Sequence, residues 1–299
     1  MRRRVLVTGA SGQLAGAVAG VFGRDSLITA LTRAALDITD DRAVHAAVAA
    51  YRPDVVINCA AYNDVDRAEA EPVAALEVNA FAVRGLARAA AEAGATLVHY
   101  SSDFVFDGTA SRPYVESDPP NPQSVYAASK LLGEWFALEA PGGVVLRVES
   151  LFGAPAGWTG RKGSLGGLAD AIAAGREVPV FVDRTVSPSH VVDVAEATHA
   201  LLASGTAAGV YHCVNAGACN WRDIATEIAR LLGKPANLRL MTLETASFRA
   251  RRPRFSALEC PRLSAAGITM PTWQDALARY VREEVASRQS SAEARHDKA

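Results

Sequence analysis

Short apolar runs recur along the first 150 residues and are separated by longer stretches of helical composition. The runs are rich in Val, Ile and Leu, and each is followed by a glycine or a polar residue. Such runs predict parallel strands that are buried on both faces of a sheet. They occupy Arg4–Thr8, Leu27–Leu31, Pro53–Asn58, Thr96–Tyr100 and Gly143–Val148. Because a helical stretch separates each run from the next, we expect an α/β fold with a doubly wound parallel sheet.

A glycine-rich turn lies directly between the first predicted strand and a helix that runs to Phe22. The turn contains Gly9, Ser11 and Gly12. A strand, a glycine turn and a helix in this order are typical of a dinucleotide site. Gly9 would permit the tight turn, and Gly12 would let backbone amides reach a pyrophosphate at the positive end of the helix. The alternative is a glycine turn that binds no ligand.

The end of the second predicted strand bears on the choice of dinucleotide. Thr32 and Arg33 follow this strand, and no Asp or Glu ends it. A carboxylate here would hold the ribose hydroxyls of NAD, whereas an arginine can hold the 2′-phosphate of NADP. We therefore expect NADPH, with NADH as the second choice. The alternative for Arg33 is a solvated surface arginine.

Residues after the second and third strands could also face a cofactor. Asp37 could reach the adenine amine with its carboxylate, or it could be a loop turn residue. Cys59, Ala60 and Ala61 are small and follow the third strand, so a cofactor could lie against the backbone there. Asn79 lies inside the next helix, predicted over 72–93, and would brace the catalytic strand if it faced the sheet.

A tyrosine and a lysine four residues apart predict proton-transfer chemistry. Tyr126 and Lys130 would share one face of a helix. A cation one turn away should lower the pKa of the phenol from its usual value of about 10. Ser102 follows the fourth apolar run, so its hydroxyl lies at a strand end. These three groups could protonate a carbonyl oxygen while a hydride adds to its carbon, but the spacing alone also fits two residues on a solvated helix.

The regular alternation of predicted strands and helices ends after Ser150. Residues 153–167 are glycine-rich and predict a mobile loop that acts as a lid over substrate. Its Trp158, Arg161 and Lys162 could contact a phosphate or could simply be solvated. Further strands are predicted at Val178–Val182, Val210–Asn215 and Leu238–Leu243, and a last helix at Trp273–Val285.

Composition excludes several classes of function. The 299 residues are 49% hydrophobic and 21% charged, with a net charge of -1. This balance gives no electrostatic reason to expect nucleic acid or an anionic membrane as a partner. The 4 cysteines are scattered, which argues against a disulfide framework or a zinc site. The apolar run near the N-terminus is too short for a signal peptide, so we expect a cytoplasmic protein.

Several motifs follow one another in a characteristic order. They are Thr8–Leu14, Asp37–Asp40, Pro53–Tyr62, Val65–Glu69, Ser101–Gly108, Ser124–Glu134, Arg252–Pro253 and Trp273–Leu277. With these motifs the sequence resembles the extended short-chain dehydrogenase/reductases. Within that group it is similar to the dTDP-4-dehydrorhamnose reductase family, whose relatives include the non-catalytic β subunit of methionine adenosyltransferase.

The resemblance assigns site residues. Its catalytic residues would be Ser102, Tyr126 as proton donor, and Lys130, which would also hold the nicotinamide ribose. The cofactor-binding residues would be Gly9, Ser11, Gly12, Gln13, Leu14, Arg33, Asp37, Ile38, Ala60, Ala61, Tyr62, Asn63, Asn79, Tyr126 and Lys130. Gln13 and Leu14 would contact the pyrophosphate, and Ile38 the adenine.

The resemblance also implies which residues line the sugar. These are Val65, Ser102 and Asp103, together with Phe104 and Leu151. Phe104 stands where the reductases usually carry tyrosine, and Leu151 where many carry tryptophan. Both departures affect which sugar would fit. No counterpart of the family's acidic metal ligands is found, so we expect no metal.

The implied activity is NAD(P)H-dependent reduction of a nucleotide-linked 4-keto-6-deoxy sugar. The alternatives are a non-catalytic NADP(H)-binding regulatory subunit and a reductase or epimerase for another nucleotide sugar. Residues 1–150 would form an NAD(P)-binding Rossmann domain that is completed by about 178–215. Residues 151–286 would form a smaller α/β substrate-binding subdomain, and 287–299 a disordered tail. A homodimer is the oligomer we consider.

Overall fold

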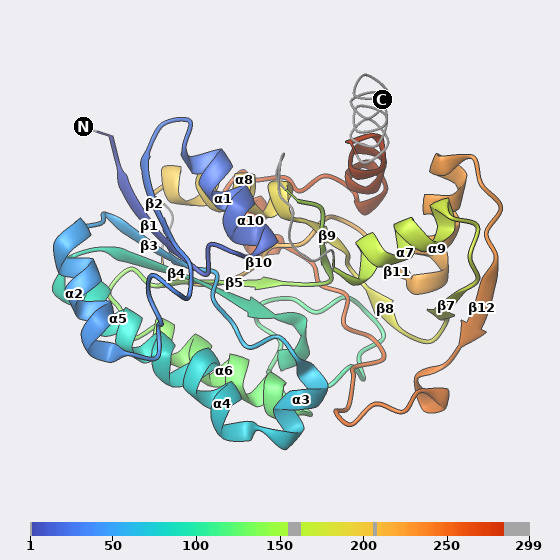
Figure 1. Cartoon of the computed structure of the whole chain (residues 1–299), viewed down its shortest axis with the longest axis horizontal. Helices are drawn as coiled ribbons and strands as arrows, with labels where there is room; N and C mark the ends of the chain where they lie inside the picture. Colours follow the sequence, from blue (N-terminus) through green and yellow to red (C-terminus); the bar gives the residue numbers. More distant parts are fainter. Residues whose placement is uncertain (1, 155–162, 206–207, 284–299) are drawn as a thin grey trace, which may run out of the picture.

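The computed structural model describes residues 2–154, 163–205 and 208–283. Six parallel strands form a central sheet in the order β10-β5-β4-β3-β1-β2, with helices on both faces (Figure 1). The strands are β1 Arg4–Thr8, β2 Leu27–Leu31, β3 Val55–Asn58, β4 Thr96–Ser102, β5 Val144–Val148 and β10 Gly209–His212. The predicted doubly wound α/β fold is therefore confirmed. The strand order reverses between β1 and β3, where such sheets bind ligands at the carboxyl ends of their strands.

Alternate residues of each strand enter different cores, because successive side chains of a strand point to opposite faces. Val5 and Val7 of β1 pack in the core under α1 and α8, whereas Leu6 packs in the core under α2 and α5. This arrangement explains why the strands read as continuous apolar runs. The helices are α1 Gln13–Phe22, α2 Asp41–Tyr51, α3 Val65–Ala70, α5 Ala82–Glu92, α6 Val125–Ala137, α8 Val191–Ala203 and α10 Pro261–Ala265.

The helix predicted over 72–93 is interrupted. It consists of α4, Pro72–Leu76, then a π-helical turn at Glu77–Phe81, and then α5. Asn79 lies in the π turn and is buried. A π turn inside an α-helix is often found at a functional site because it turns side chains away from the regular helical positions.

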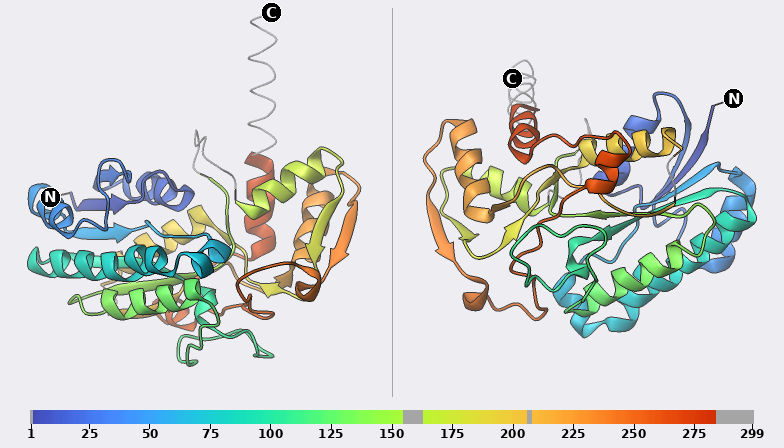
Figure 2. Two further views of the ribbon diagram at one scale, coloured as in Figure 1. Left: turned by 60° about the horizontal axis from the view of Figure 1, so that its bottom comes forward. Right: turned by 180° about the vertical axis from the view of Figure 1, so that it is seen from behind.

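A second lobe packs beside the sheet at the right of Figure 1, and Figure 2 shows the two lobes side by side. Its core is formed by α7, α9, β7, β12 and helical residues 273–283. The elements of this half are β6 Leu151–Phe152, α7 Ser164–Ala173, β7 Val178–Phe181, β8 Thr185–Val186, β9 Ser189–His190, β11 Cys219–Asn220, α9 Trp221–Leu232 and β12 Leu238–Met241.

Two expectations about this half need correction. Of the stretch 178–215, β10 joins the central sheet, but β7 pairs with β12 in the second lobe. The glycine-rich segment does not continue as a loop to Gly167, because α7 already begins at Ser164. The predicted lid residues Trp158, Arg161 and Lys162, and the tail 287–299, lie outside the described residues.

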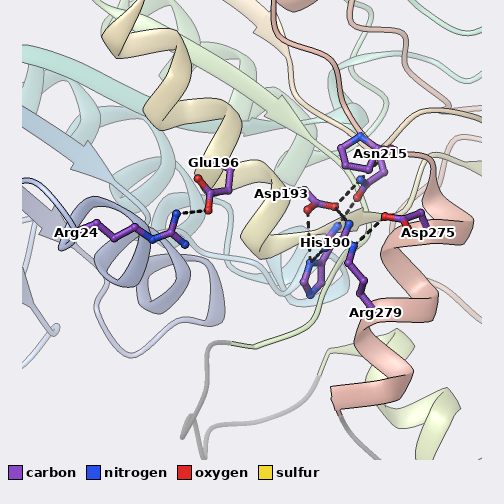
Figure 3. Close-up of polar contacts among 8 residues, drawn as sticks. Arg24, His190, Asp193, Glu196, Asn215, Asp275 and Arg279 are labelled. Atoms are coloured by element: carbon purple, nitrogen blue, oxygen red, sulfur yellow. Dashed lines mark hydrogen bonds and ion pairs between the residues drawn. The ribbon is translucent and has the colours of Figure 1, made fainter.

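A polar cluster joins the last helix to α8 (Figure 3). Asp193 of α8 accepts hydrogen bonds from Arg279 Nη2 at 2.7 Å and from Asn215 Nδ2 at 2.8 Å. Burial raises the pKa of this carboxyl, but the hydrogen bonds from His190, Arg279 and Asn215 outweigh burial and lower it to about 2. Asp193 is therefore ionised at neutral pH and anchors the helical residues 273–283 to the first lobe.

Candidate functional site

Ser102 and Tyr126 meet at the carboxyl edge of the sheet. Ser102 is the last residue of β4, and Tyr126 is the second residue of α6. Ser124 caps that helix by accepting a hydrogen bond from the Ala127 amide at 3.2 Å. Tyr126 packs edge-to-face on Phe104 with ring centroids 5.5 Å apart. The Ser102 hydroxyl interacts with the phenol strongly enough to lower its pKa, so the two predicted groups face each other.

The net pKa shift of Tyr126 is opposite to the one predicted. Burial raises the pKa of Tyr126 to about 12 and the charge of Asp103 adds to this rise, whereas the hydrogen bond between the phenol and Ser102 opposes it. The predicted acidification by Lys130 is therefore wrong in this structure. Lys130 instead donates a hydrogen bond to the Tyr100 carbonyl oxygen at 2.6 Å. A phenol with this pKa is protonated at neutral pH, but it is a weaker acid than a free tyrosine, because a general acid is most effective when its pKa is near the working pH.

Lys130 is held inside the first lobe. Its side chain is 2% exposed, and burial lowers its pKa to about 8. The carbonyl of Tyr100 in β4 fixes the ammonium beside the strand that carries Ser102. Lys130 is thus still mostly cationic at neutral pH, next to the edge at which Ser102 and Tyr126 meet.

Asn79 braces the loop after β3 and the helix α6, which carries Tyr126. Its Oδ1 accepts from the Tyr62 amide at 2.8 Å, and its Nδ2 donates to the Tyr62 carbonyl and to Ser129 Oγ, both at 3.0 Å. Asn79 was predicted to brace the strand that ends at Ser102. Its side chain instead contacts the loop after β3 and α6. Because the side-chain amide is used on protein partners, we assign Asn79 a positioning role for Tyr62 and Tyr126.

The glycine turn after β1 lies against the turn after β3. Gly9 has a φ of +69°, and a Cβ there would lie 2.6 Å from the Ala60 nitrogen. Gly12 precedes α1 without a side-chain cap, and the first turn of α1 has no acidic residue. The amides at this helix end therefore keep donor capacity and a positive dipole for an anion. These features fit the pyrophosphate of a dinucleotide.

Other predicted cofactor residues divide between the surface and the core. The Arg33 side chain is 84% exposed at the end of β2, and its Nε lies 3.3 Å from Asp37 Oδ2. Thr39 donates hydrogen bonds that lower the pKa of Asp37, and the Arg33 charge lowers it further. Leu14 and Ile38 are buried, and their side chains pack in the cores of the first lobe. Leu14 was predicted to contact the pyrophosphate and Ile38 the adenine. Neither side chain is exposed to make such a contact.

Predicted sugar-lining residues gather around Tyr126. Val65, Phe104 and Tyr62 pack against the small cluster that contains Tyr126. Leu151 lies further along the same edge, and its carbonyl accepts a hydrogen bond from Gln13 Nε2 at 3.3 Å. Ala61 and Asn63 follow β3 beside Tyr62. The structure thus brings the glycine turn, the β3 loop and the Tyr126 region to one edge of the sheet.

Comparison with known proteins gives the family. A model described as the RmlD substrate binding domain matches residues 3–286. The chain belongs to the RmlD substrate binding domain family. It is 41% identical over 285 residues to a dTDP-4-dehydrorhamnose reductase of Streptomyces griseus, covering 92% of each chain. It is 40% identical to a protein of the same name from Mycobacterium tuberculosis, covering 92% of this chain and 91% of that one.

Solved structures of the same fold agree with the assignment to the RmlD family. A dTDP-4-dehydrorhamnose reductase from Bacillus anthracis, solved in complex with NADP, superposes with a TM-score of 0.89. It shares 31% sequence identity, over 95% of this chain and 100% of that chain. A second such reductase, from Clostridium acetobutylicum, superposes with a TM-score of 0.87 at 32% identity, over 93% of this chain and 98% of that chain.

The RmlD-family site contains three polar residues that sequence reasoning missed. Glu149 directly follows β5, is 1% exposed, and accepts hydrogen bonds from the Ser187 amide and Ser256 Oγ, both at 2.6 Å. Arg184 lies over the Phe104 ring, with 5.5 Å between its Cζ and the ring centroid. An acidic residue directly after a buried strand was a usable signal for Glu149. Arg184 and Ser256 have no comparable local signal.

Within the described ranges, no three or more His, Cys, Asp and Glu side chains are grouped so that they could hold a metal ion. In the same part of the chain, no helix has the length and apolar character needed to cross a membrane.

Proposed function

We propose that this RmlD-family chain is an NADPH-dependent reductase of a nucleotide-linked 4-keto-6-deoxy sugar. The observation that carries the proposal is that Ser102 and Tyr126 meet at the sheet edge where the glycine turn leaves helix amides available to an anion. The Lys130 ammonium bonds to the Tyr100 carbonyl of the strand that ends at Ser102. The relatives named dTDP-4-dehydrorhamnose reductase support the substrate class, and the NADP in the Bacillus anthracis structure supports the cofactor.

The roles of the residues follow from their environments. When bound, NADPH supplies the hydride for the carbonyl carbon. The Tyr126 phenol, which is protonated at neutral pH, donates its proton to the oxygen. Ser102 steadies the negative charge that develops on that oxygen. Lys130, a buried cation beside the strand that ends at Ser102, would hold the nicotinamide ribose.

The remaining residues would bind the two ligands. The first-turn amides of α1 would hold the pyrophosphate and Arg33 the 2′-phosphate, with Asp37 near the adenine. Val65, Asp103, Phe104 and Leu151 would line the sugar. Phe104 offers a ring in place of a hydroxyl, so this part of the pocket favours an apolar group of the sugar, such as the methyl of a 6-deoxy sugar.

The test of the function is loss of nicotinamide absorbance when purified protein meets NADPH and a dTDP-4-keto-6-deoxy sugar. We expect turnover with at least one member of a panel of nucleotide 4-keto sugars. Tight NADPH binding without turnover across the panel would instead identify a regulatory subunit. Interconversion of sugar epimers without net NADPH oxidation would identify an epimerase.

Arg33→Ala should reduce discrimination between the two cofactors. The variant should weaken NADPH binding by roughly 10- to 100-fold, because a charge-assisted contact to a phosphate contributes about 1.5–3 kcal/mol. NADH binding should be nearly unchanged, since NADH lacks the 2′-phosphate. Dissociation constants measured by fluorescence titration give both values. The exposed Arg88 of α5 provides the matched control, Arg88→Ala, which should affect neither cofactor. Equal losses of NADPH and NADH would exclude a 2′-phosphate contact for Arg33.

A further inference from the structure

Asp103 and Glu149 are two buried carboxylic acids that lie beside each other near Tyr126. The mechanism proposed above uses neither of them as an acid. Ser102 of β4 and Val148 of β5 are register partners in the sheet. Asp103 and Glu149 directly follow these two partners, so the ends of neighbouring strands bring the acids together. Asp103 is 3% exposed and Glu149 is 1% exposed.

Hydroxyl groups connect these acids to Tyr126. Ser102 Oγ donates to Asp103 Oδ1 at 2.8 Å, and the same hydroxyl lowers the pKa of Tyr126. Ser256 Oγ donates to Glu149 Oε1 at 2.6 Å, and the same hydroxyl lowers the pKa of Asp103. Tyr126, Ser102, Asp103, Ser256 and Glu149 therefore form one series of neighbouring groups that can exchange protons.

The local charges do not balance if both acids are ionised. Arg184 is the cation that acts on both Asp103 and Glu149. Within the described residues, Asp103 Oδ2 and Arg184 Nε are buried without a hydrogen-bond partner. Other titratable groups also interact with these three: Glu149 raises the pKa of Cys219, Arg252 lowers that of Arg184, and Asp103 raises that of Tyr126.

One proton compensates for this imbalance. Two buried carboxylates and one guanidinium would leave an excess negative charge out of water, which is costly. Burial raises the pKa of Asp103 and of Glu149, and the charge of Asp103 raises the pKa of Glu149 further. Because the two carboxyls interact, they titrate as a pair rather than independently.

We propose that Asp103 and Glu149 hold one proton between them and return it through the Ser102 hydroxyl to Tyr126 after each reduction. This inference rests on the reductase function proposed above. The Ser102 O–H proton moves to the phenolate, and the proton of the carboxyl moves to the Ser102 oxygen. The products are a neutral phenol and a second carboxylate, and no electrons are exchanged with the acids. A proton taken up from the solvent, the one that the net reduction consumes, later restores the carboxyl.

The shared proton can be observed without substrate. The infrared spectrum of the full-length protein at neutral pH should contain the carbonyl stretch of a protonated, buried carboxyl that shifts in heavy water. Glu149→Gln should remove this band, because Asp103 then ionises opposite Arg184. Asp193→Asn should keep the band, since Asp193 belongs to the separate cluster in Figure 3 and is already ionised. Absence of the band from the unmodified protein, or its survival in Glu149→Gln, would overturn the proposal.

Rapid mixing with NADPH and a 4-keto sugar tests the return of the proton. Tyr126 begins each experiment protonated, so the first turnover of Glu149→Gln should be slowed less than the turnovers that follow it. Later turnovers should be roughly tenfold slower or more, because reprotonation then lacks its internal donor. Equal slowing of the first and later turnovers, or no slowing of either, contradicts the relay.

A second variant covers the case in which Glu149→Gln does not fold. Ser256→Ala removes the hydroxyl between the acids, and it should slow later turnovers while the infrared band remains. Unchanged later turnovers in Ser256→Ala contradict the relay. Failure of the unmodified protein to oxidise NADPH with any sugar in the panel would overturn the reductase function and the relay with it, while the infrared result still decides whether the acids share a proton.

Discussion

Replacing Tyr126 with phenylalanine is expected to lower kcat by roughly 10²- to 10⁴-fold, the usual contribution of a positioned general acid. The substitution removes one oxygen from a buried ring that packs edge-to-face on Phe104, so the packing of α6 should be preserved. The proton donation occurs only in the transition state, and KM for the sugar should therefore change little. Steady-state oxidation of NADPH gives both constants.

The matched control is Tyr114→Phe, because Tyr114 is also a buried tyrosine but its hydroxyl bonds to Asp107 and to backbone amides of the 108–110 turn. It should lose some stability and keep most of its activity. Tyr126→Phe with kcat close to that of the unmodified protein would show that another group donates the proton. A loss confined to KM would make Tyr126 a binding residue.

Glu134→Gln is expected to lower the free energy of unfolding by about 3–5 kcal/mol, the usual cost of leaving one member of a buried ion pair without its partner. Glu134 of α6 accepts from Arg147 Nε at 2.9 Å and Nη2 at 2.8 Å, and from Ser101 Oγ at 2.6 Å. The two charged side chains are 2% and 4% exposed. Glutamine presents a donor to one guanidinium nitrogen and leaves the Arg147 charge uncompensated. Urea unfolding followed by circular dichroism measures the loss.

The double variant Glu134→Gln with Arg147→Met is the control for this pair. Removing the second charge should recover part of the stability, because no uncompensated ion then remains in the core. A single variant that loses less than about 1 kcal/mol, the typical size for an exposed pair, would contradict a buried ion pair here. The pair links α6 to β4 and β5, so its loss should also lower activity by loosening the placement of Tyr126.

Much of the fold could be predicted from the local pattern of apolar and polar residues. A strand that is buried on both faces must be apolar throughout, so the runs that contain Leu6, Val56 and Leu97 identified their strands with few errors. The glycine turn was readable for a similar reason, because Gly9 occupies a backbone conformation and a contact with Ala60 that a larger residue would not tolerate. Ser102, Tyr126 and Lys130 were found because short motifs carry them.

Other features depend on contacts between distant segments. Arg184 and Ser256 lie on different loops and are brought to Asp103 by the packing of distant segments, whereas the pairing of β4 with β5 places Glu149 beside Asp103. The strand β7 pairs with β12 and does not join the central sheet. The sequence could not predict this, because the possible partner strands have similar patterns of apolar residues.

By itself, the amino-acid sequence determined the strand and helix periodicities, the anion site at the start of α1 and the residue types available for proton transfer, because these depend on neighbours along the chain. The tertiary structure decided the direction of the pKa shifts. Burial raises the pKa of Tyr126 and of the two acids behind it, and burial is set by which segments pack together rather than by the spacing of Tyr126 and Lys130.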